Sequence, residues 1–473
     1  MNRRLKQAAD QRDKRAEDSI PEELRNSAER ILNYAAIPAD RKEVFRKNLE
    51  MFRNIQDKSG SESRKIREKI SPVFFEVYSA VFKKVLLENN SSPLYHMFLQ
   101  YAYVDENLLQ PEHTNALYEL ICKPAVAGRY SVYNGQEWLA KIYTREKDPS
   151  INEFGLDYFD VFREKKKKGE LHERDKTEYD NNVEGRLAHE IDNLFRIGQR
   201  LCYRQTRGYF PILHSGMIIK DLPKSMITAD KIEKSLNKVL EVDFSAFHRE
   251  IVYNCPKKGI KKELIMKPVL PDFILMPTFG AGAVMWQELT GRVRTSPGRI
   301  ILPIFSAENL DNLMVELVSK FRWELSRAMF SYSRNEVSQD SLIGEYRNYI
   351  QFYKKNRDLS EEAKEKVKVQ IDKHRNNVGD IFASDYHIWI NFESKGLLRL
   401  NKVAREILFK HCPFSESVRE NLEKHPLYNQ QITKFNNNRA KDLKLLEARY
   451  NKLRKADGEL DIELMNNLAY YKM

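Results

Sequence analysis

Long stretches of helical periodicity constrain this chain more than any single motif. In residues 310–330 the apolar side chains recur every three or four positions, which places them on one face of a helix. These residues are Leu310, Leu313, Met314, Leu317, Val318, Phe321, Leu325 and Met329, and Ser306 is expected to cap the helix. Only 18 glycines and 17 prolines interrupt the 473 residues. The pattern predicts a mainly α-helical protein built from multi-helix bundle domains.

Further helices are expected elsewhere. One should begin near Pro21, and another should start at Pro72 and end before Asn89. Residues 360–377 place acidic side chains early and basic ones late, which suits the helix dipole. Residues 430–473 have a helical pattern with few apolar positions, so this tail could pair with a partner.

The region around residues 264–305 differs from the rest. Its short apolar runs are separated by prolines, which is typical of strands at an edge or of strand ends. These prolines are Pro268, Pro271, Pro277, Pro297 and Pro303. We therefore expect a small β element here within the helical protein.

Composition shifts divide the chain into five expected segments. They are a charged tail at 1–19, an N-terminal helical domain at 20–123, an irregular connecting region at 124–180, a central helical domain at 181–425 containing the β element, and a C-terminal helical tail at 426–473.

Charge and cysteine usage indicate a cytoplasmic protein. Lys and Arg number 80 against 68 Asp and Glu, for a net charge of +12, which favours phosphate-rich partners. No stretch approaches the roughly 18 continuous apolar residues that a membrane span needs, and the N-terminus lacks a signal-peptide core. The cysteines are Cys122, Cys202, Cys255 and Cys412, and their wide spacing fits free thiols in a reducing compartment.

Motifs for common catalytic and cofactor chemistry are missing from the sequence. His189-Glu190 has no second histidine at metal-ligand spacing, so we expect no metal site. There is no Gly-x-Ser-x-Gly elbow, and His214 beside Ser215 is not triad geometry. The pair Gly280 and Gly282 is too short for a dinucleotide fingerprint, and no Walker loop occurs. We therefore expect no bound cofactor.

A glycine- and arginine-rich segment at residues 279–299 is the clearest candidate site. Guanidinium groups bind phosphate through paired hydrogen bonds, and backbone amides in a glycine-rich turn can hold an anion. The predicted anion-binding residues are Arg292, Arg294, Arg299, Thr295 and Ser296. The competing interpretation is that these arginines pair with glutamates elsewhere and shape a tight connection.

The polar face of the helix expected at 183–204 is a second candidate. Its apolar stripe includes Leu187, Ile191 and Leu194. The side chains proposed to line a polar cleft are His189, Asp192, Arg196 and Arg200. The alternative is simple exposure to solvent.

Two resemblances bear on function. Phe279-Gly280 and Arg294-Thr295 resemble parts of the phosphate-binding cassette of cyclic-nucleotide-binding proteins, although Ala281 stands where that family has a ribose-binding glutamate. More broadly, the strings beginning at Glu184, Phe321, Tyr349 and Arg399 resemble an uncharacterised bacterial region, found mainly in clostridia and spirochaetes. That region often shares a polypeptide with a cyclic-nucleotide-binding domain. The resemblance, over roughly residues 150–450, implies a bacterial signalling-linked protein.

These observations favour a cytoplasmic regulatory or scaffolding module, with protein partners or a homo-oligomer and a link to cyclic-nucleotide signalling. The alternative is a phosphate- or nucleic-acid-binding protein that uses the basic loop at residues 291–299. A second alternative is an enzyme whose site combines that loop with His189, Asp192 and Arg196.

Overall fold

The chain forms two compact units that alternate along the sequence. The computed structural model describes residues 20–58, 60–123, 128–152, 154–201, 212–213, 222–255, 260–286, 298–327 and 340–473. Unit 1 comprises Met1–Lys231, Asp272–Gln287 and Arg299–Leu310, and unit 2 comprises Ile232–Pro271, Glu288–Gly298 and Asp311–Met473. The expected central domain at 181–425 therefore contributes to both units.

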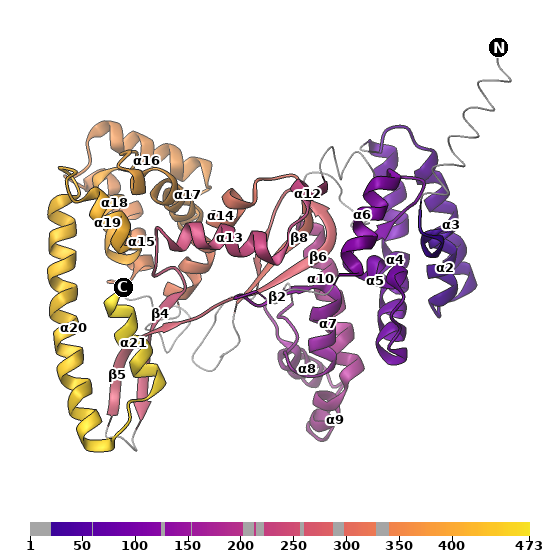
Figure 1. The fold of residues 1–473 in the computed structure, drawn as a ribbon, viewed down its shortest axis with the longest axis horizontal. Coiled ribbons are helices and arrows are strands. Elements are labelled where there is room, and N and C mark those ends of the chain that lie inside the picture. Colours follow the sequence, from indigo (N-terminus) through magenta and orange to yellow (C-terminus); the bar gives the residue numbers. More distant parts are fainter. Residues whose placement is uncertain are drawn as a thin grey trace, which may run out of the picture. The chain divides into compact units, whose positions relative to one another are not determined.

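Helices dominate both units, as the periodicity predicted, and the strands form small sheets (Figure 1). The helices of unit 1 are α2 (Ser27–Tyr34), α3 (Ala39–Asn54), α4 (Ser61–Glu88), α5 (Pro93–Tyr101), α6 (Pro111–Ile121), α7 (Gly135–Tyr143), α8 (Tyr158–Lys167), α9 (Lys176–Asn181), α10 (Val183–Leu201) and α12 (Leu222–Ser225). No helix within the described ranges is long and apolar enough to cross a membrane.

Helix α4 differs from its prediction at its start. It runs through Pro72 and begins at Ser61, although a proline was expected at the first turn. A buried face that includes Ile66, Ile70 and Phe74 continues across the proline, so packing outweighs the missing backbone N–H. Asn89 ends the helix in the left-handed conformation, with φ 48°. Near Pro21 the chain instead makes only the 3₁₀ turn η1 (Glu22–Leu24).

A four-stranded sheet forms the centre of unit 1. Its strands are β2 (Val132–Asn134), β6 (Asp272–Gly280), β7 (Val284–Trp286) and β8 (Arg299–Ser306), in the order β2-β6-β8-β7. β6 lies parallel to both β2 and β8, and β7 is antiparallel to β8. Every residue of β6 and β8 is buried, which explains their continuous apolar sequences. A shorter parallel pair joins β1 (Tyr103–Val104) to β3 (Ile212–Leu213).

Pro268 ends β5 and Pro271 directly precedes β6, as expected for strand ends, but two other prolines lie inside strands. Pro277 lies in β6 and Pro303 in β8, and both strands are central. The β6–β8 register shifts between Met276 and Phe279, around Pro277. A local irregularity therefore accommodates a residue that cannot donate a ladder hydrogen bond.

The region at 124–180 is more ordered than predicted. It contains β2, α7, α8, α9 and the turn η2 (Glu173–Asp175). Asn134 caps α7 through a reciprocal capping box with Glu137, and Asp157 caps α8 in the same way with Asp160. These capping residues are visible in the sequence, and they indicate helices in a region that was predicted to be irregular.

Unit 2 is a helical assembly with one hairpin. Its helices are α13 (Ala229–Leu240), α14 (Leu310–Arg327), α15 (Leu342–Phe352), α16 (Glu361–Lys373), α17 (Val378–Asn391), α18 (Lys402–His411), α19 (Glu416–Leu422), α20 (Asn429–Asp457) and α21 (Ile462–Lys472), with 3₁₀ turns η4 (Tyr353–Lys355) and η5 (Glu393–Lys395). α13 and α14 begin at the ends of unit 1 segments. Ser306 lies four residues before α14, where its hydroxyl accepts the Glu308 N–H at 3.1 Å rather than capping the helix.

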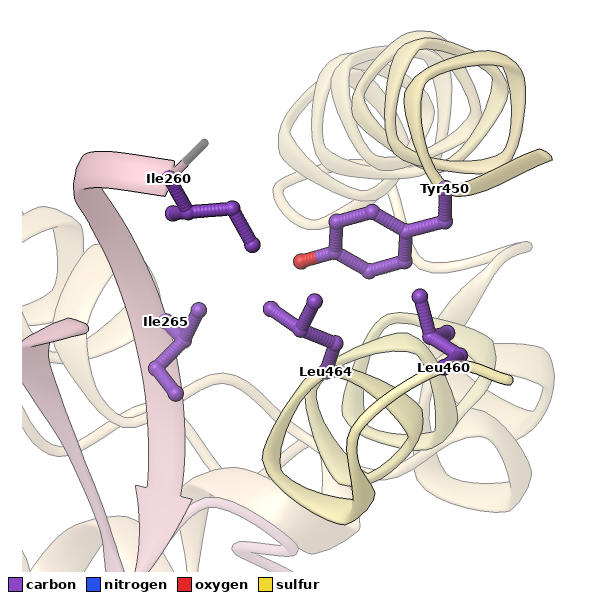
Figure 2. Packing of buried hydrophobic residues seen from close by; sticks show 5 residues of the cluster. All are labelled: Ile260, Ile265, Tyr450, Leu460 and Leu464. Atoms are coloured by element: carbon purple, nitrogen blue, oxygen red, sulfur yellow. The ribbon is translucent and has the colours of Figure 1, made fainter. Parts of the chain in front are cut away.

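The C-terminal helices pack against the hairpin of β4 (His248–Cys255) and β5 (Ile260–Pro268). Figure 2 shows Ile260 and Ile265 of β5 facing Tyr450 of α20 and Leu464 of α21. The Asn467 side chain joins these elements, because it accepts the Met266 N–H at 2.8 Å and donates to the Tyr450 hydroxyl at 2.8 Å. The tail predicted as helical is therefore part of the core of unit 2.

Candidate functional site

Of the four residues predicted on the polar face of α10, the three with described side chains make separate contacts. His189 donates through Nε2 to the Ser150 carbonyl at 3.0 Å, and its ring lies edge-on to Tyr158. Asp192 and Arg196 form an exposed ion pair at 2.9 Å. The side chain of Arg200 lies outside the described part of the chain. The cleft proposed for these residues stays a prediction.

The buried side of α10 carries the more unusual group, Glu190. This fully buried carboxylate accepts hydrogen bonds from Trp138 Nε1 at 2.6 Å, from the Ser150 hydroxyl at 2.7 Å and from the Ser150 N–H at 2.5 Å. Asn193, one turn further along α10, donates to the Ser150 carbonyl at 2.9 Å. Charge-assisted hydrogen bonds of this kind compensate for removing the carboxylate from water.

Arg299 completes the same network from the first residue of β8. Its guanidinium donates to the Ser150 hydroxyl and to the Asp148 carbonyl, the latter at 2.5 Å, and lies 4.0 Å from the Glu190 carboxylate. Burial lowers the pKa of Arg299, and the nearby Glu190 opposes that shift. Arg299 is thus placed in a buried strand and bound by the protein itself. Its predicted loop companions Arg292, Arg294, Thr295 and Ser296 lie outside the described residues, so anion binding there stays a prediction.

This network links four parts of unit 1. Trp138 comes from α7, Glu190 from α10, Arg299 from β8, and Ser150 from the connection before α8. Each charged group is engaged by protein atoms, and the arrangement resembles a structural junction more than a substrate site. A neighbouring ion pair between Lys147 and Asp272, at 3.1 Å, fixes the start of β6 in the same way.

Unit 2 has a comparable junction at Arg322 of α14. Its Nη1 donates to the Ser245 and His248 carbonyls at 2.9 and 2.7 Å. The fully buried Asp243 accepts from the Ser245 hydroxyl at 2.7 Å and from the Tyr386 hydroxyl at 2.8 Å. Burial raises the pKa of Asp243, while the charge of Arg322 opposes the rise. Charged side chains again hold separate segments together.

One side of α20 is exposed and carries several lysines. Its inner side is buried at Ile432 and Tyr450, and Arg439 lies among the rings of Phe244 and Tyr470, each 4.9 Å from its guanidinium. Positions about two residues beyond these inner residues point outward. The outward residues, all exposed, are Lys434, Asn437, Asn438, Lys441, Lys444 and Lys452, and we call them the α20 lysine face.

The lysine face differs from other basic helices of unit 2 in its ion pairing. On α16, Lys364, Lys366 and Lys368 each pair with a glutamate of the same helix, at 2.8, 2.7 and 3.2 Å. Among the described residues, no ion pair involves a lysine of the α20 lysine face. The acidic and basic neighbours that do pair, Glu447 with Lys472 and Arg449 with Glu263, bridge to other elements. Positive charge therefore accumulates along this face.

An open depression of about 650 Å³ lies beside the end of α3 and the start of α4, lined by residues such as Met51 and Ile66. A shallow, open depression of about 460 Å³ lies on one face of α20 between Asn429 and Lys441, over the first part of the lysine face. A mostly apolar cavity in unit 1, lined by residues such as Leu24 and Phe98, has room for only about 10 Å³. No group of three His, Cys, Asp or Glu residues with metal-binding geometry occurs among the described residues.

The described residues thus define a mainly α-helical protein in which buried charged groups join separate segments, and one side of α20 is basic and exposed. Residues 331–470 match the model of a family described as Domain of unknown function (DUF8509). This match falls within unit 2 and includes α20 and α21, but not the β4–β5 hairpin on which they pack. No curated protein and no solved structure matches the chain.

Sequence reasoning overlooked Glu190, Ser150 and the α20 lysine face. For Glu190 the signal was present, because it follows Leu187 by three positions and precedes Leu194 by four, on the apolar stripe. For α20 the signal was the recurrence of lysine and asparagine opposite Ile432, Leu446 and Tyr450. Ser150 lies in an irregular connection, so periodicity could not have found it.

Proposed function

We propose that this protein is a regulatory or scaffolding module that binds a polyanionic partner through unit 2. The observation that carries the proposal is the α20 lysine face. Its four lysines lie on one side of one helix, in contrast to the glutamate-paired lysines of α16. Accumulated positive charge attracts polyanions and releases their counterions on binding.

The composition of the face argues against other kinds of partner. Protein interfaces are depleted of lysine and usually centre on a buried apolar or aromatic anchor. A membrane-lying helix needs a broad apolar side facing outward. On α20 the apolar side is used inside unit 2, and Leu445 is the large apolar residue that remains exposed beside the lysines, at 70%. A polyanion requires neither feature.

The other expectations from sequence remain proposals beside this one. They are a bacterial source, a cytoplasmic location, a link to cyclic-nucleotide signalling and assembly with protein partners or copies of itself. Phosphate binding by the loop at residues 291–299 also remains open. An enzyme built on His189 and Asp192 has no specific observation in its favour, since both side chains are engaged by neighbours.

Retention on immobilised heparin tests the proposal. The full chain carrying Lys434→Gln, Lys441→Gln and Lys444→Gln should elute at clearly lower salt than the wild type. The matched control carries Lys364→Gln, Lys366→Gln and Lys368→Gln, which changes the net charge equally but on α16. If both variants shift equally, the effect comes from total charge and the proposed face is wrong. Unchanged retention of the α20 variant would also overturn it.

A further inference from the structure

The shape of the α20 lysine face suggests which polyanion it fits. α20 is a single helix of 29 residues, and Lys434 and Lys452 are separated by about 27 Å at 1.5 Å per residue. In Figure 1 it runs along the outer margin of unit 2, with α21 and the β4–β5 hairpin on its inner side. An α-helix with its side chains is about 10–12 Å across, close to the width of the major groove of B-form DNA, and α20 exposes one basic side.

The side chains on this face suit both parts of such a groove. Lysine ammonium groups contact phosphates on the groove walls as mobile point charges. Asn437 and Asn438 lie between Lys434 and Lys441, and an asparagine amide can donate to and accept from one adenine edge. The small side chain of Ala448 lies between Lys444 and Lys452 and leaves room for close approach.

We propose that the partner is B-form duplex DNA, with α20 lying in the major groove and its lysine face toward the DNA. This inference rests on the proposed polyanion binding and narrows it. Duplex RNA shares the polyphosphate chemistry, but its major groove is deep and narrow and excludes a helix. Heparin and single strands offer charge without a groove of this shape. The preference among these ligands therefore reports the groove, and binding as such reports the charge.

Fluorescence anisotropy with the full chain separates the two levels of the proposal. The probes are duplex DNA of about 20 base pairs, duplex RNA of the same sequence and the single DNA strand. We expect duplex DNA to bind at least about tenfold more tightly than duplex RNA. Methyl green, which occupies the major groove, should compete with the protein, and the minor-groove ligand distamycin should not.

The variants test how DNA affinity depends on salt concentration. Each lysine-to-glutamine change on α20 that removes a phosphate contact should reduce the slope of log affinity against log salt by about 0.9. The α16 variant should keep the wild-type slope, and circular dichroism should show both variants folded. Asn437→Ala with Asn438→Ala should keep the slope, since amides carry no charge, but should flatten any preference among DNA sequences.

The outcomes are distinguishable. Equal affinity for duplex DNA and duplex RNA, or competition by distamycin alone, would overturn the groove inference while polyanion binding stands. If the α20 variant binds both heparin and duplex DNA as tightly as the wild type does, both proposals are wrong. Tight duplex binding that persists in the α20 variant would place the DNA site elsewhere.

Discussion

The Arg299 guanidinium lies over the ring of Trp138, with its central carbon 4.5 Å from the ring centroid. Arg299 comes from β8 and Trp138 from α7, and both also bind members of the Glu190–Ser150 pair. The arginine predicted to meet an external anion is thereby enclosed by aromatic and polar groups of its own unit. A cation held in this way contributes to folding through stacking and hydrogen bonds together.

Replacing Arg299 tests this structural role. Arg299→Ala leaves the buried Glu190 without its nearby positive charge, so we expect a loss of about 3–5 kcal/mol in the free energy of unfolding, measured by urea denaturation. Arg292→Ala with Arg294→Ala is the comparison, because these residues belong to the same predicted loop. If Arg299 were only an anion ligand, its replacement would leave stability unchanged and weaken phosphate binding instead.

Gly280 should tolerate no side chain, for a reason of packing. A Cβ built on Gly280 would lie 2.5 Å from the carbonyl oxygen of Leu201 at the end of α10. We expect Gly280→Ala to cost about 1–3 kcal/mol of stability, because the backbone of one element would have to move. Gly282→Ala is the matched control, since its Cβ would lie 4.0 Å from the same oxygen. Equal melting temperatures for the two variants would contradict this account of Gly280.

A buried ion pair in the DUF8509 region offers a third test. Glu393 is fully buried and accepts from Arg405 Nε at 2.8 Å and from the Arg399 and Leu400 N–H groups at 2.6 and 2.7 Å. Burial raises the pKa of this carboxyl, but hydrogen bonds from Arg405, Tyr428 and the two amides outweigh that effect and lower the pKa overall.

Removing one partner should cost more than removing both. Arg405→Met leaves the buried carboxylate without its cationic partner, so we expect a loss of about 3–5 kcal/mol in unfolding free energy. Adding Glu393→Leu removes the stranded charge and should recover part of that loss. A double-mutant cycle from denaturation midpoints measures the coupling between the two sites. Additive losses would show that the pair contributes no specific interaction.

Two titratable groups of unit 2, the half-buried His248 and the buried Asp385, should give opposite pH dependence. Burial and the charge of Arg322 lower the pKa of His248 to about 4, from 6.5 in the unfolded chain. The unfolded chain therefore binds the extra proton between these values, and the contribution of His248 to stability falls as pH drops from 6.5 to 4. Burial raises the pKa of Asp385 from 3.8 to about 6, so its contribution rises as pH drops from 6 to 3.8.

Comparison with uncharged variants separates the two groups. The stability of the wild type relative to His248→Gln should decrease by roughly 3 kcal/mol between pH 7 and pH 4. Relative to Asp385→Asn it should increase by a similar amount over the same range. Denaturation at four or five pH values checks both signs, and parallel curves for wild type and either variant would contradict the assigned shift.

Sequence periodicity predicted the helices but not the packing contacts between them and the strands. The spacing of Leu187, Ile191 and Leu194 predicted α10 and its buried side, because burial and helical spacing are local properties. The predicted small β element is present, but the pairing of β2 with β6 joins segments that no local signal connects. The same holds for Arg299. Its partners Asp148 and Ser150 lie about 150 positions earlier, so the sequence of the loop alone could not predict these hydrogen bonds.

The glycines show the same limit. In the sequence, Gly280 and Gly282 stand together at the start of the glycine- and arginine-rich segment, and nothing there distinguishes one from the other. Only one of the two meets another backbone closely, and the reason lies in α10, far away in sequence. A glycine in the sequence indicates that another group can pack closely against the backbone there. Which group does so depends on the tertiary structure.

The interleaved units impose an order on synthesis. β2 leaves the ribosome long before β6 and β8, so the central sheet of unit 1 cannot close until residue 306 has been made. By then β4 and β5 of unit 2 have emerged, yet Ile260 and Ile265 must wait for Leu464 to cover them. The nascent chain therefore exposes the apolar side of β5 while the residues between β5 and α21 are being made. Such a protein should depend on chaperones that hold β5 until α21 arrives.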